Sequence, residues 1–414
     1  MRRATFLAFG LSVLAAPVVG QRAGESWGDE LGPVPSSEPM RSVASRKLEP
    51  LVWPAPPLSR PPAAVRALYV NAWAFGSSRF FDLVRLADST EINSLVIDVK
   101  DDTGYLTYPS TVATAVQIGA NRQIRAPDAE QRLRLLRAHG IHPIARIVVA
   151  KDPLLAAGKW SWSIQDRNGG LWRDRLNFAW VDAYNDSVWV YAAALAAEAV
   201  RKGFAEIQFD YVRFPDEPRA HMASAVFPSR RPGETIRKGL ARNLRLLRHL
   251  VKPLGVPFTI DVFGMSTNAE VDMGIGQIWE DLVTTADVVL PMVYPSHYSH
   301  AIYGVTHPNS EPYEIVKGAL SDALRRNRRL GGRVAEVRPY LQAFTLGSPR
   351  YTPDRVRLQI AAAADLGIHA WVLWNARSSY DPRIFRPRLA VPMVQVASRL
   401  PSPARRRSRQ AMPR

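Results

Sequence analysis

Two carboxylates near the ends of consecutive apolar runs are the residues of this sequence best suited to chemistry. Asp210 lies in the run AEIQFDY (205–211), and Asp261 lies in the next run, PFTIDVF (257–263). If both runs are adjacent parallel strands, their carboxyl groups meet at one end of the sheet. Two carboxyl groups that flank a glycosidic bond can cleave it, one by attack or activation of water and the other by protonating the departing oxygen. We predict that these two residues form a catalytic pair, with the 5–5.5 Å separation of a retaining mechanism.

The elements that would position this pair repeat with some regularity along the chain. Apolar runs typical of strands alternate with helical stretches, several of which end at a glycine, where a helix commonly stops. This pattern predicts a (β/α)8 TIM barrel with insertions at about 101–127 and 151–181. A doubly wound open sheet is the alternative, but it usually carries a glycine-rich turn after its first strand, and none is present. The eight runs are 66–74, 93–100, 142–149, 205–211, 257–263, 287–294, 337–344 and 370–375.

Alternation along each run predicts which side chains face the barrel lumen. Polar residues share one face, as Gln208 does with Asp210, whereas Ile207 and Phe209 share the other. Such polar groups near the carboxyl ends of barrel strands are typical of active sites. A purely structural ion-pair network, for example Arg146 with Asp98, is the competing explanation. The residues predicted to bind substrate are Asp98, Lys100, Arg146, Gln208, Tyr211, Arg213, Tyr294, His297, Tyr340, Gln342, Trp371 and Asn375.

Aromatic residues near the predicted rim suit a sugar ligand, because sugar rings present apolar faces that pack on aromatic rings. Trp73, Tyr211, Tyr294, Tyr298 and Trp371 belong to this set. By the alternation count, Trp374 is expected to face the helices as part of the core.

Other chemistries find less support. The cluster Asp98, Lys100, Asp101 and Asp102 could hold a divalent metal, but the lysine opposes a cation and sugar binding is favoured. The chain has no cysteine, no HExxH, no GxSxG and no phosphate-binding loop. We therefore expect no metal and no cofactor. Glu280 is a reserve acid, although a glutamate on a helix surface explains it more simply.

The two ends of the sequence suggest export. Residues 1–20 combine two arginines, a short apolar run and small residues, which is typical of a secretory signal peptide. An uncleaved signal would leave an N-terminal membrane anchor. A proline-rich linker (21–64), the barrel (65–385) and a basic, disordered tail (386–414) follow. The net charge of +17 suits attraction of the tail to an anionic envelope surface better than specific nucleic-acid recognition in an exported protein.

Seven motifs in this order also resemble a known family. NSLVIDVKDDTGYLTY, PIARIVVAKDPLLA, GFAEIQFDYVRFP, DVFGMS with GIGQIWEDL, DVVLPMVYPSHY, RPYLQAF and WVLWNA, within residues 65–380, resemble a bacterial family of exported glycoside hydrolase domains. The resemblance implies a TIM barrel distantly similar to α-amylase-type glycosidases. It implies Asp210 as nucleophile and Asp261 as general acid/base. Strand 7 lacks the His–Asn pair typical of amylases and carries Arg338 and Gln342, which argues against starch-like substrates.

Together these observations predict a periplasmic or extracellular glycoside hydrolase acting on a polysaccharide of the envelope or surroundings. The alternative is a non-catalytic glycan-binding TIM barrel of the cell envelope.

Overall fold

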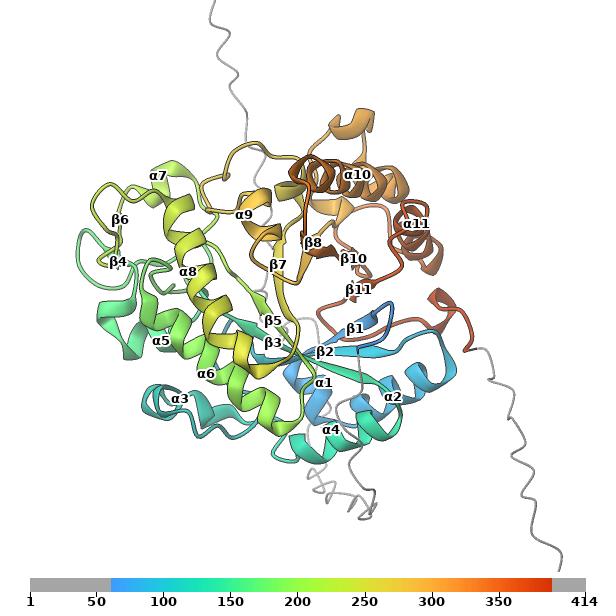
Figure 1. Ribbon diagram of the computed structural model, residues 1–414, viewed down its shortest axis with the longest axis horizontal. Helices are drawn as coiled ribbons and strands as arrows, with labels where there is room; N and C mark the ends of the chain where they lie inside the picture. The colour runs from blue at the N-terminus through green and yellow to red at the C-terminus, as the bar shows by residue number, and fades with distance from the viewer. Residues whose placement is uncertain (1–60, 389–414) are drawn as a thin grey trace, which may run out of the picture.

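The computed structural model describes residues 61–388, which form a closed parallel barrel (Figure 1). The predictions for the signal peptide, for most of the proline-rich linker and for nearly all of the basic tail lie outside the described residues. Around the barrel the strands follow in the order β1 (Arg66–Val70), β2 (Ser94–Lys100), β3 (His142–Val148), β5 (Glu206–Asp210), β7 (Phe258–Phe263), β8 (Val288–Met292), β9 (Glu336–Val337) with β10 (Tyr340–Gln342), and β11 (Trp371–Trp374). The pairing of β11 with β1 and of β10 with β8 closes the barrel, which confirms the predicted fold.

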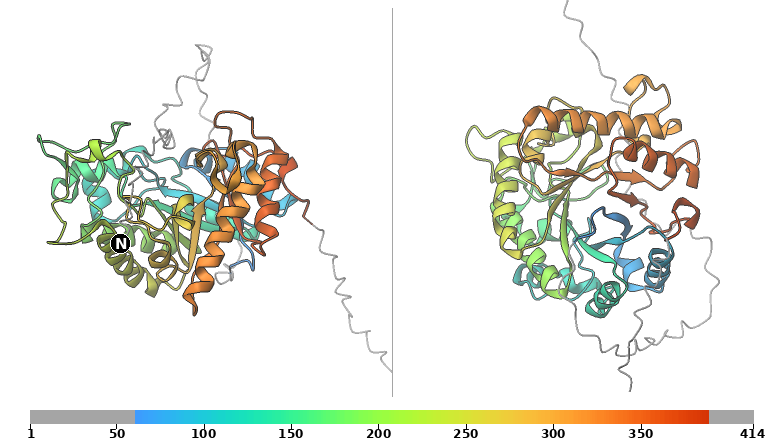
Figure 2. Two further views of the ribbon diagram at one scale, coloured as in Figure 1. Left: turned by 90° about the horizontal axis from the view of Figure 1, so that it is seen from above. Right: turned by 45° about the vertical axis from the view of Figure 1, so that its right-hand side comes forward.

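Helices surround the strands as an outer ring (Figure 2). Between residues 61 and 388, no helix combines the length and the apolar character needed to cross a membrane. The helices are α1 (Ala72–Gly76), α2 (Arg79–Ser89), α3 (Ala113–Ile118), α4 (Ala129–Ala138), α5 (Pro153–Gly158), α6 (Asp186–Lys202), α7 (Arg219–Met222), α8 (Ile236–Val251), α9 (Trp279–Val283), α10 (Pro312–Leu330) and α11 (Pro353–Ala364).

Local sequence signals fix the ends of the main helices. The side chain of Asn185 accepts a hydrogen bond from the Ser187 N–H at the start of α6, and that helix ends at Gly203, whose φ of 117° suits glycine. Thr235 caps α8 in the same way through the Lys238 N–H. These caps orient each helix where the chain leaves one strand and returns to the next.

The seventh barrel position is divided into two short strands. β9 pairs with the lower half of β8, and β10 pairs with β11 and with Met292 at the end of β8. Pro339 lies between them, and a proline has no N–H to donate to a sheet ladder. The break therefore follows directly from the sequence.

Side-chain alternation agrees with the prediction along most strands. Ile97, Ile207 and Phe209 belong to the large core between barrel and helices, whereas Val96 and Ile144 belong to a separate cluster inside the barrel.

The prediction is wrong for strand β11. Val372 lies in the lumen cluster with Trp374 packed against it, and Trp371 lies in the core that faces the helices. Trp371, predicted to bind substrate, is thus a core residue with 2% of its surface exposed.

Both predicted insertions are present at the carboxyl end of the barrel. The segment after β2 contains α3 and a short 3-10 helix, and the segment after β3 contains α5 and β4 (Gln165–Asp166). β4 pairs with β6 (Ala225–Val226), which belongs to the loop after β5 (Figure 1). The loops after β3 and β5 are therefore joined above the barrel.

A buried ionic network occupies the opposite, amino-terminal end of the lumen. Arg338 Nη1 donates to Glu206 Oε1 at 2.6 Å, and His142 Nε2 lies 3.3 Å from Glu206 Oε2. All three residues are at most 4% exposed. The arginine charge contributes to lowering the pKa of Glu206, although burial alone would raise it. This network is far from the rim and has a structural role.

Removing one member of this network should destabilise the fold without touching the site. We expect Arg338→Met to lower the free energy of unfolding by about 3–5 kcal/mol, because Glu206 is left as a buried charge without its main partner. Urea denaturation would measure this loss. The double variant Glu206→Gln/Arg338→Met should recover much of it, and an equally unstable double variant would contradict the explanation.

Candidate active site

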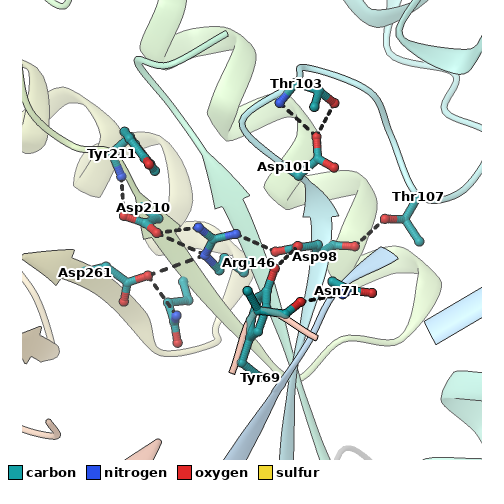
Figure 3. A network of polar contacts seen from close by, with 12 residues as sticks. Tyr69, Asn71, Asp98, Asp101, Thr103, Thr107, Arg146, Asp210, Tyr211 and Asp261 are labelled. Carbon is teal, nitrogen blue, oxygen red and sulfur yellow. Dashed lines mark hydrogen bonds and ion pairs between the residues drawn. The ribbon is translucent and has the colours of Figure 1, made fainter. Parts of the chain in front are cut away.

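Arg146 is the centre of the polar network at the carboxyl end of the lumen (Figure 3). Its Nη1 donates to Asp98 Oδ1 at 2.6 Å, and its Nε and Nη2 donate to Asp210 Oδ2 at 3.0 and 2.5 Å. Its Nε is also 3.9 Å from Asp261 Oδ2. One guanidinium on β3 thus holds carboxylates from β2, β5 and β7. Burial alone would lower the pKa of Arg146, but the charges of Asp98 and Asp210 raise it well above its usual value.

Asp210 is held on both of its oxygens. Besides the two hydrogen bonds from Arg146 to Oδ2, the backbone N–H of Tyr211 donates to Oδ1 at 2.5 Å. Tyr211 has a φ of 52°, an uncommon left-handed conformation for a tyrosine that turns this N–H back onto the carboxylate. The end of strand β5 is therefore shaped around Asp210.

Asp261 has different surroundings. Gln208 Nε2 donates to Asp261 Oδ2 at 2.9 Å and to Tyr340 Oη at 2.6 Å. Asp261 Oδ1 is buried and has no hydrogen-bond partner among residues 61–388. Burial, followed by the negative charge of Asp210, raises the pKa of Asp261 well above its usual range. Asp261 therefore holds its proton more tightly than an exposed aspartic acid, whereas Asp210 accepts three hydrogen bonds.

The contacts of Arg146 also limit the separation of the two carboxyl groups. The Oδ2 atoms of Asp210 and Asp261 lie 3.0 and 3.9 Å from the same Nε, so they are no more than about 7 Å apart. This limit includes the 5–5.5 Å of retaining glycosidases and only the shortest separations of inverting ones.

Asp98 forms the other side of the network. Tyr69 Oη donates to Asp98 Oδ2 at 2.5 Å, and the Tyr69 ring stacks on Trp374 with centroids 3.8 Å apart. The Arg146 guanidinium lies 5.1 Å from the centre of the Trp374 ring. Burial raises the pKa of Asp98, although Arg146 opposes this. The Arg146–Asp98 ion pair, given above as an example of a purely structural network, is present.

A cleft next to the carboxylates is lined by aromatic side chains and by a few polar groups. Tyr211, Tyr294, His297 and Tyr298 lie in its wall. The Tyr294 and Tyr298 hydroxyls and His297 Nε2 are buried and have no hydrogen-bond partner within the described part of the chain. The charge of Asp261 contributes to the raised pKa of Tyr294, after burial, so this tyrosine lies close to the carboxyl pair. The cleft thus offers unpaired polar atoms where a sugar ring could bind.

Arg213 fixes one wall of this cleft. Its guanidinium lies 4.6–5.1 Å from the ring centres of Trp180, Tyr211 and Phe263. Lys151 lies in the same wall and pairs with Asp102 at 3.0 Å.

His297 is a neutral residue of the cleft. Its Nδ1 lies 3.0 Å from Ser296 Oγ, and burial lowers its pKa to about 4. Because an unfolded histidine has a pKa of about 6.5, the unfolded chain binds a proton between these two pH values that the folded chain does not. Stability contributed by His297 is therefore present above about pH 6.5 and is lost as the pH falls towards 4.

Replacing His297 should remove this pH dependence. We expect His297→Gln to lose less stability than the wild type between pH 7 and pH 5, measured by urea denaturation at both values. His249 is an exposed histidine and provides the matched control, since His249→Gln should leave the slope unchanged. An identical slope for His297→Gln and wild type would contradict a neutral His297.

The structure does not bring four predicted substrate-binding residues into this site. A register shift between Asp98 and Lys100 pairs Lys100 with Ile147, so the expected alternation is wrong there, and Lys100 pairs instead with Asp152 at 2.5 Å. Gln342 accepts from the Ser296 N–H and donates to the Phe344 carbonyl. Asn375 donates to the carbonyls of Ala343 and Ser379. With Trp371 in the core, these residues brace the fold.

The acidic cluster after β2 is divided among separate partners. Asp98 binds Arg146, Asp102 binds Lys151, and Asp101 accepts from the Thr103 N–H at 3.0 Å. Burial, with the charges of Asp98 and Asp102, raises the pKa of Asp101 to about 7. Residues 61–388 contain no group of three or more acidic or histidine side chains arranged to hold a metal ion. Glu280 pairs with Arg326 at 2.5 Å and is a structural residue of α9.

Several residues of the site were not predicted from the sequence. Tyr69 shares the lumen face with Ala67, so the alternation used for the other strands would have found it. Lys151 and Trp180 come from loops without periodicity, and only the folded arrangement brings them to the cleft, where they join the predicted rim residue Tyr298.

Comparisons with known proteins agree with this architecture. A family profile described as "Putative glycosyl hydrolase domain" matches residues 67–380. A search of the curated proteins found no match. The glycoside hydrolase domain of PgaB (BpsB) from Bordetella bronchiseptica is 12% identical, with a TM-score of 0.54 over 77% of this chain and 95% of that one. This similarity shows a shared fold.

Two further solved structures align with lower TM-scores. A hypothetical protein from Ruminiclostridium thermocellum is 36% identical over 46% of this chain and 94% of its own, with a TM-score of 0.40. An α-galactosidase from Thermus thermophilus is 15% identical over 78% of this chain and 61% of its own, with a TM-score of 0.46.

Proposed function

The chain belongs to the family of glycosyl hydrolase domains and is a glycoside hydrolase by that membership, and from this premise we propose that Asp210 and Asp261 cleave a glycosidic bond with retention of configuration. One observation carries the proposal. Arg146 Nε donates to Asp210, a carboxylate that accepts three hydrogen bonds in all. The same atom lies 3.9 Å from Asp261, whose pKa is raised. A retaining glycosidase requires one ionised carboxylate as the nucleophile and one protonated carboxylic acid as the proton donor.

In the first step Asp210 attacks the anomeric carbon of a sugar bound in the cleft. The bond from that carbon to the glycosidic oxygen breaks, and Asp261 gives its proton to the departing oxygen. The unpaired Asp261 Oδ1 is the atom available for this transfer. A covalent ester between Asp210 and the sugar results, and Asp261 is left as a carboxylate.

In the second step Asp261 acts as a base. It takes a proton from a water molecule, whose oxygen attacks the anomeric carbon and displaces Asp210. Arg146 stabilises the Asp210 carboxylate that is released, because its Nε and Nη2 already donate to that group. Asp98 positions Arg146 from the other side.

The proposed substrate is a polysaccharide of the envelope or of the surroundings. Aromatic walls and the unpaired hydroxyls of Tyr294 and Tyr298 suit a sugar ring with several hydroxyl groups. The composition of residues 1–20 supports export to the periplasm or beyond, and the basic tail suits contact with an anionic envelope surface.

A second function, binding without turnover, is favoured by the burial of the pair. Asp210 is 5% exposed and Asp261 is 1% exposed, and Asp210 is tied on both oxygens. A glycan-binding barrel of the cell envelope would keep such a network closed. An enzyme must open a path from the cleft to the two carboxyl groups.

Release of reducing ends from a panel of soluble polysaccharides distinguishes the two functions. Turnover with the newly formed anomer in the configuration of the substrate, observed by proton NMR immediately after cleavage, supports the retaining enzyme. Formation of the opposite anomer would exclude Asp210 as nucleophile, and absence of release across the panel would favour the binding barrel.

A further inference from the structure

Trp73 forms an exposed aromatic surface at the rim of the barrel. It is 65% exposed and lies in α1, which directly follows β1. The guanidinium of Arg125 lies 3.6 Å from the centre of its ring, which is stacking distance. Because one face of the indole is covered and most of the residue is still exposed, the opposite face is open to solvent.

This pair is rigidly presented. A β-carbon on Gly76, at the end of α1, would lie 2.1 Å from the carbonyl oxygen of Arg125, so only glycine allows this close packing. The side chain of Asn71 caps α1 by accepting from the Ala74 N–H at 2.7 Å, and the Asn71 N–H donates to Ser378 Oγ at 2.9 Å. Trp73 in α1 and Arg125 in the segment after β2 are therefore held together.

One residue connects this pair to the catalytic network. Thr107 Oγ1 donates to the carbonyl oxygen of Asp98 at 2.5 Å, as Figure 3 shows, and the Thr107 carbonyl accepts from the Arg125 N–H at 3.0 Å. Asp98 in turn contacts Arg146, which holds Asp210. Trp73 and Arg125 follow β1 and β2, whereas the residues that line the cleft follow β3, β5, β7 and β8.

The path along the sheet from β1 to the strand that carries Asp210 is longer than one sugar ring. β1, which leads to Trp73, is three strands away from β5, which carries Asp210. With neighbouring strands about 4.8 Å apart, this corresponds to roughly 14 Å along the sheet. A single monosaccharide in the cleft cannot reach Trp73, but a chain of several sugars can.

We propose that Trp73 and Arg125 form a second glycan subsite, which binds a remote sugar of the same polysaccharide whose bond is cleaved. This rests on the proposed function. The apolar face of the sugar packs on the open indole face, and Arg125, stacked on the other face, holds the indole in place. Within the described residues Arg125 makes no ion pair with an acidic side chain, and its one side-chain hydrogen bond goes to Gln123. The enzyme therefore recognises a polymer on both sides of its carboxyl pair.

Affinity electrophoresis of the full-length Asp210→Asn protein tests this subsite. The gels contain polygalacturonate, xylan, dextran or chitosan, and we expect retention by at least one of them. Trp73→Ala in the same background should weaken that retention about five- to tenfold, and Trp73→Phe should keep most of it. Trp160→Ala is the matched control, because Trp160 is 48% exposed and lies outside the cleft and the proposed subsite.

The outcomes separate this proposal from the catalytic one. Unchanged retention after Trp73→Ala, an equal loss in Trp160→Ala, or no retention by any of the four polysaccharides would overturn the subsite. Reducing ends released by the wild type report on hydrolysis alone. Retention that depends on Trp73, without release of reducing ends, would support the subsite and contradict hydrolysis of these polymers. Release of reducing ends, with retention that does not depend on Trp73, would support hydrolysis and contradict the subsite.

Discussion

Replacing Asp210 by asparagine is expected to lower kcat by three or more orders of magnitude while leaving glycan affinity nearly unchanged. The amide cannot attack the anomeric carbon, but it keeps the size of the carboxyl group, and its one carbonyl oxygen can still accept from Arg146 or from the Tyr211 N–H. Release of reducing ends from a polysaccharide that the wild type cleaves measures the first effect. Affinity electrophoresis on the same polymer measures the second.

A matched change elsewhere shows that this loss is specific. Asp354→Asn removes the same charge from a side chain that is 77% exposed on α11, and it should leave kcat unchanged. Asp210→Gly with added azide identifies the role of the residue. Azide attacks the anomeric carbon from the vacated side, Asp261 protonates the leaving oxygen, and a glycosyl azide with inverted configuration forms. Full activity of Asp210→Asn would refute its role as nucleophile.

Replacing Arg146 by methionine should have a large effect on stability. We expect the free energy of unfolding to fall by about 3–5 kcal/mol, because Asp98, Asp210 and Asp261 lose the only cation within 4 Å of them among residues 61–388. Urea denaturation would measure the loss. The double variant Asp98→Asn/Arg146→Met should recover part of it, because it removes one of the stranded charges.

The loss of stability in Arg146→Met should be smaller at low pH than at high pH. The pKa values of Asp98 and Asp261 are raised in the folded protein, so above about pH 3.9 the folded chain retains protons that the unfolded chain releases. Stability from these groups is therefore lost as the pH rises. Removing Arg146 raises both pKa values further, so this loss continues to higher pH. Arg146→Met should be less destabilising at pH 5 than at pH 8, and an equal loss at both would contradict the proposed origin.

The barrel could be predicted from the sequence because its strands are regular. Eight apolar runs with two-residue alternation place Gln208 and Asp210 on one face and Ile207 and Phe209 on the other, and the structure confirms both faces. Burying polar groups at every second position of a strand has no stability benefit. The polar face of these strands therefore indicated the position of the site. The ion pair between Arg146 and Asp98 was foreseeable for the same reason.

The wrong predictions concern residues whose orientation cannot be determined from the two-residue alternation of a strand. WVLW places a tryptophan on each face of β11, so composition cannot tell Trp371 from Trp374. The pairing of Ala67 with Val372 decides it, since Ala67 lies in the lumen. At Lys100 a one-residue irregularity in the β2–β3 ladder moves the side chain to the outer face. The cleft residues of the loops that were missed, such as Lys151 and Trp180, follow no two-residue alternation.

The divided seventh strand has a consequence for how the molecule moves. β7 and β8 are joined along five paired positions, whereas β8 meets β10 at one and β9 at two. Met292, at the single pairing with β10, and Tyr294 just beyond it both line the cleft. The barrel wall is thus least cross-linked beside the place where the sugar must enter, and local opening there needs less free energy than opening elsewhere. Pro339, which has no N–H to donate, keeps the pairing short at this joint.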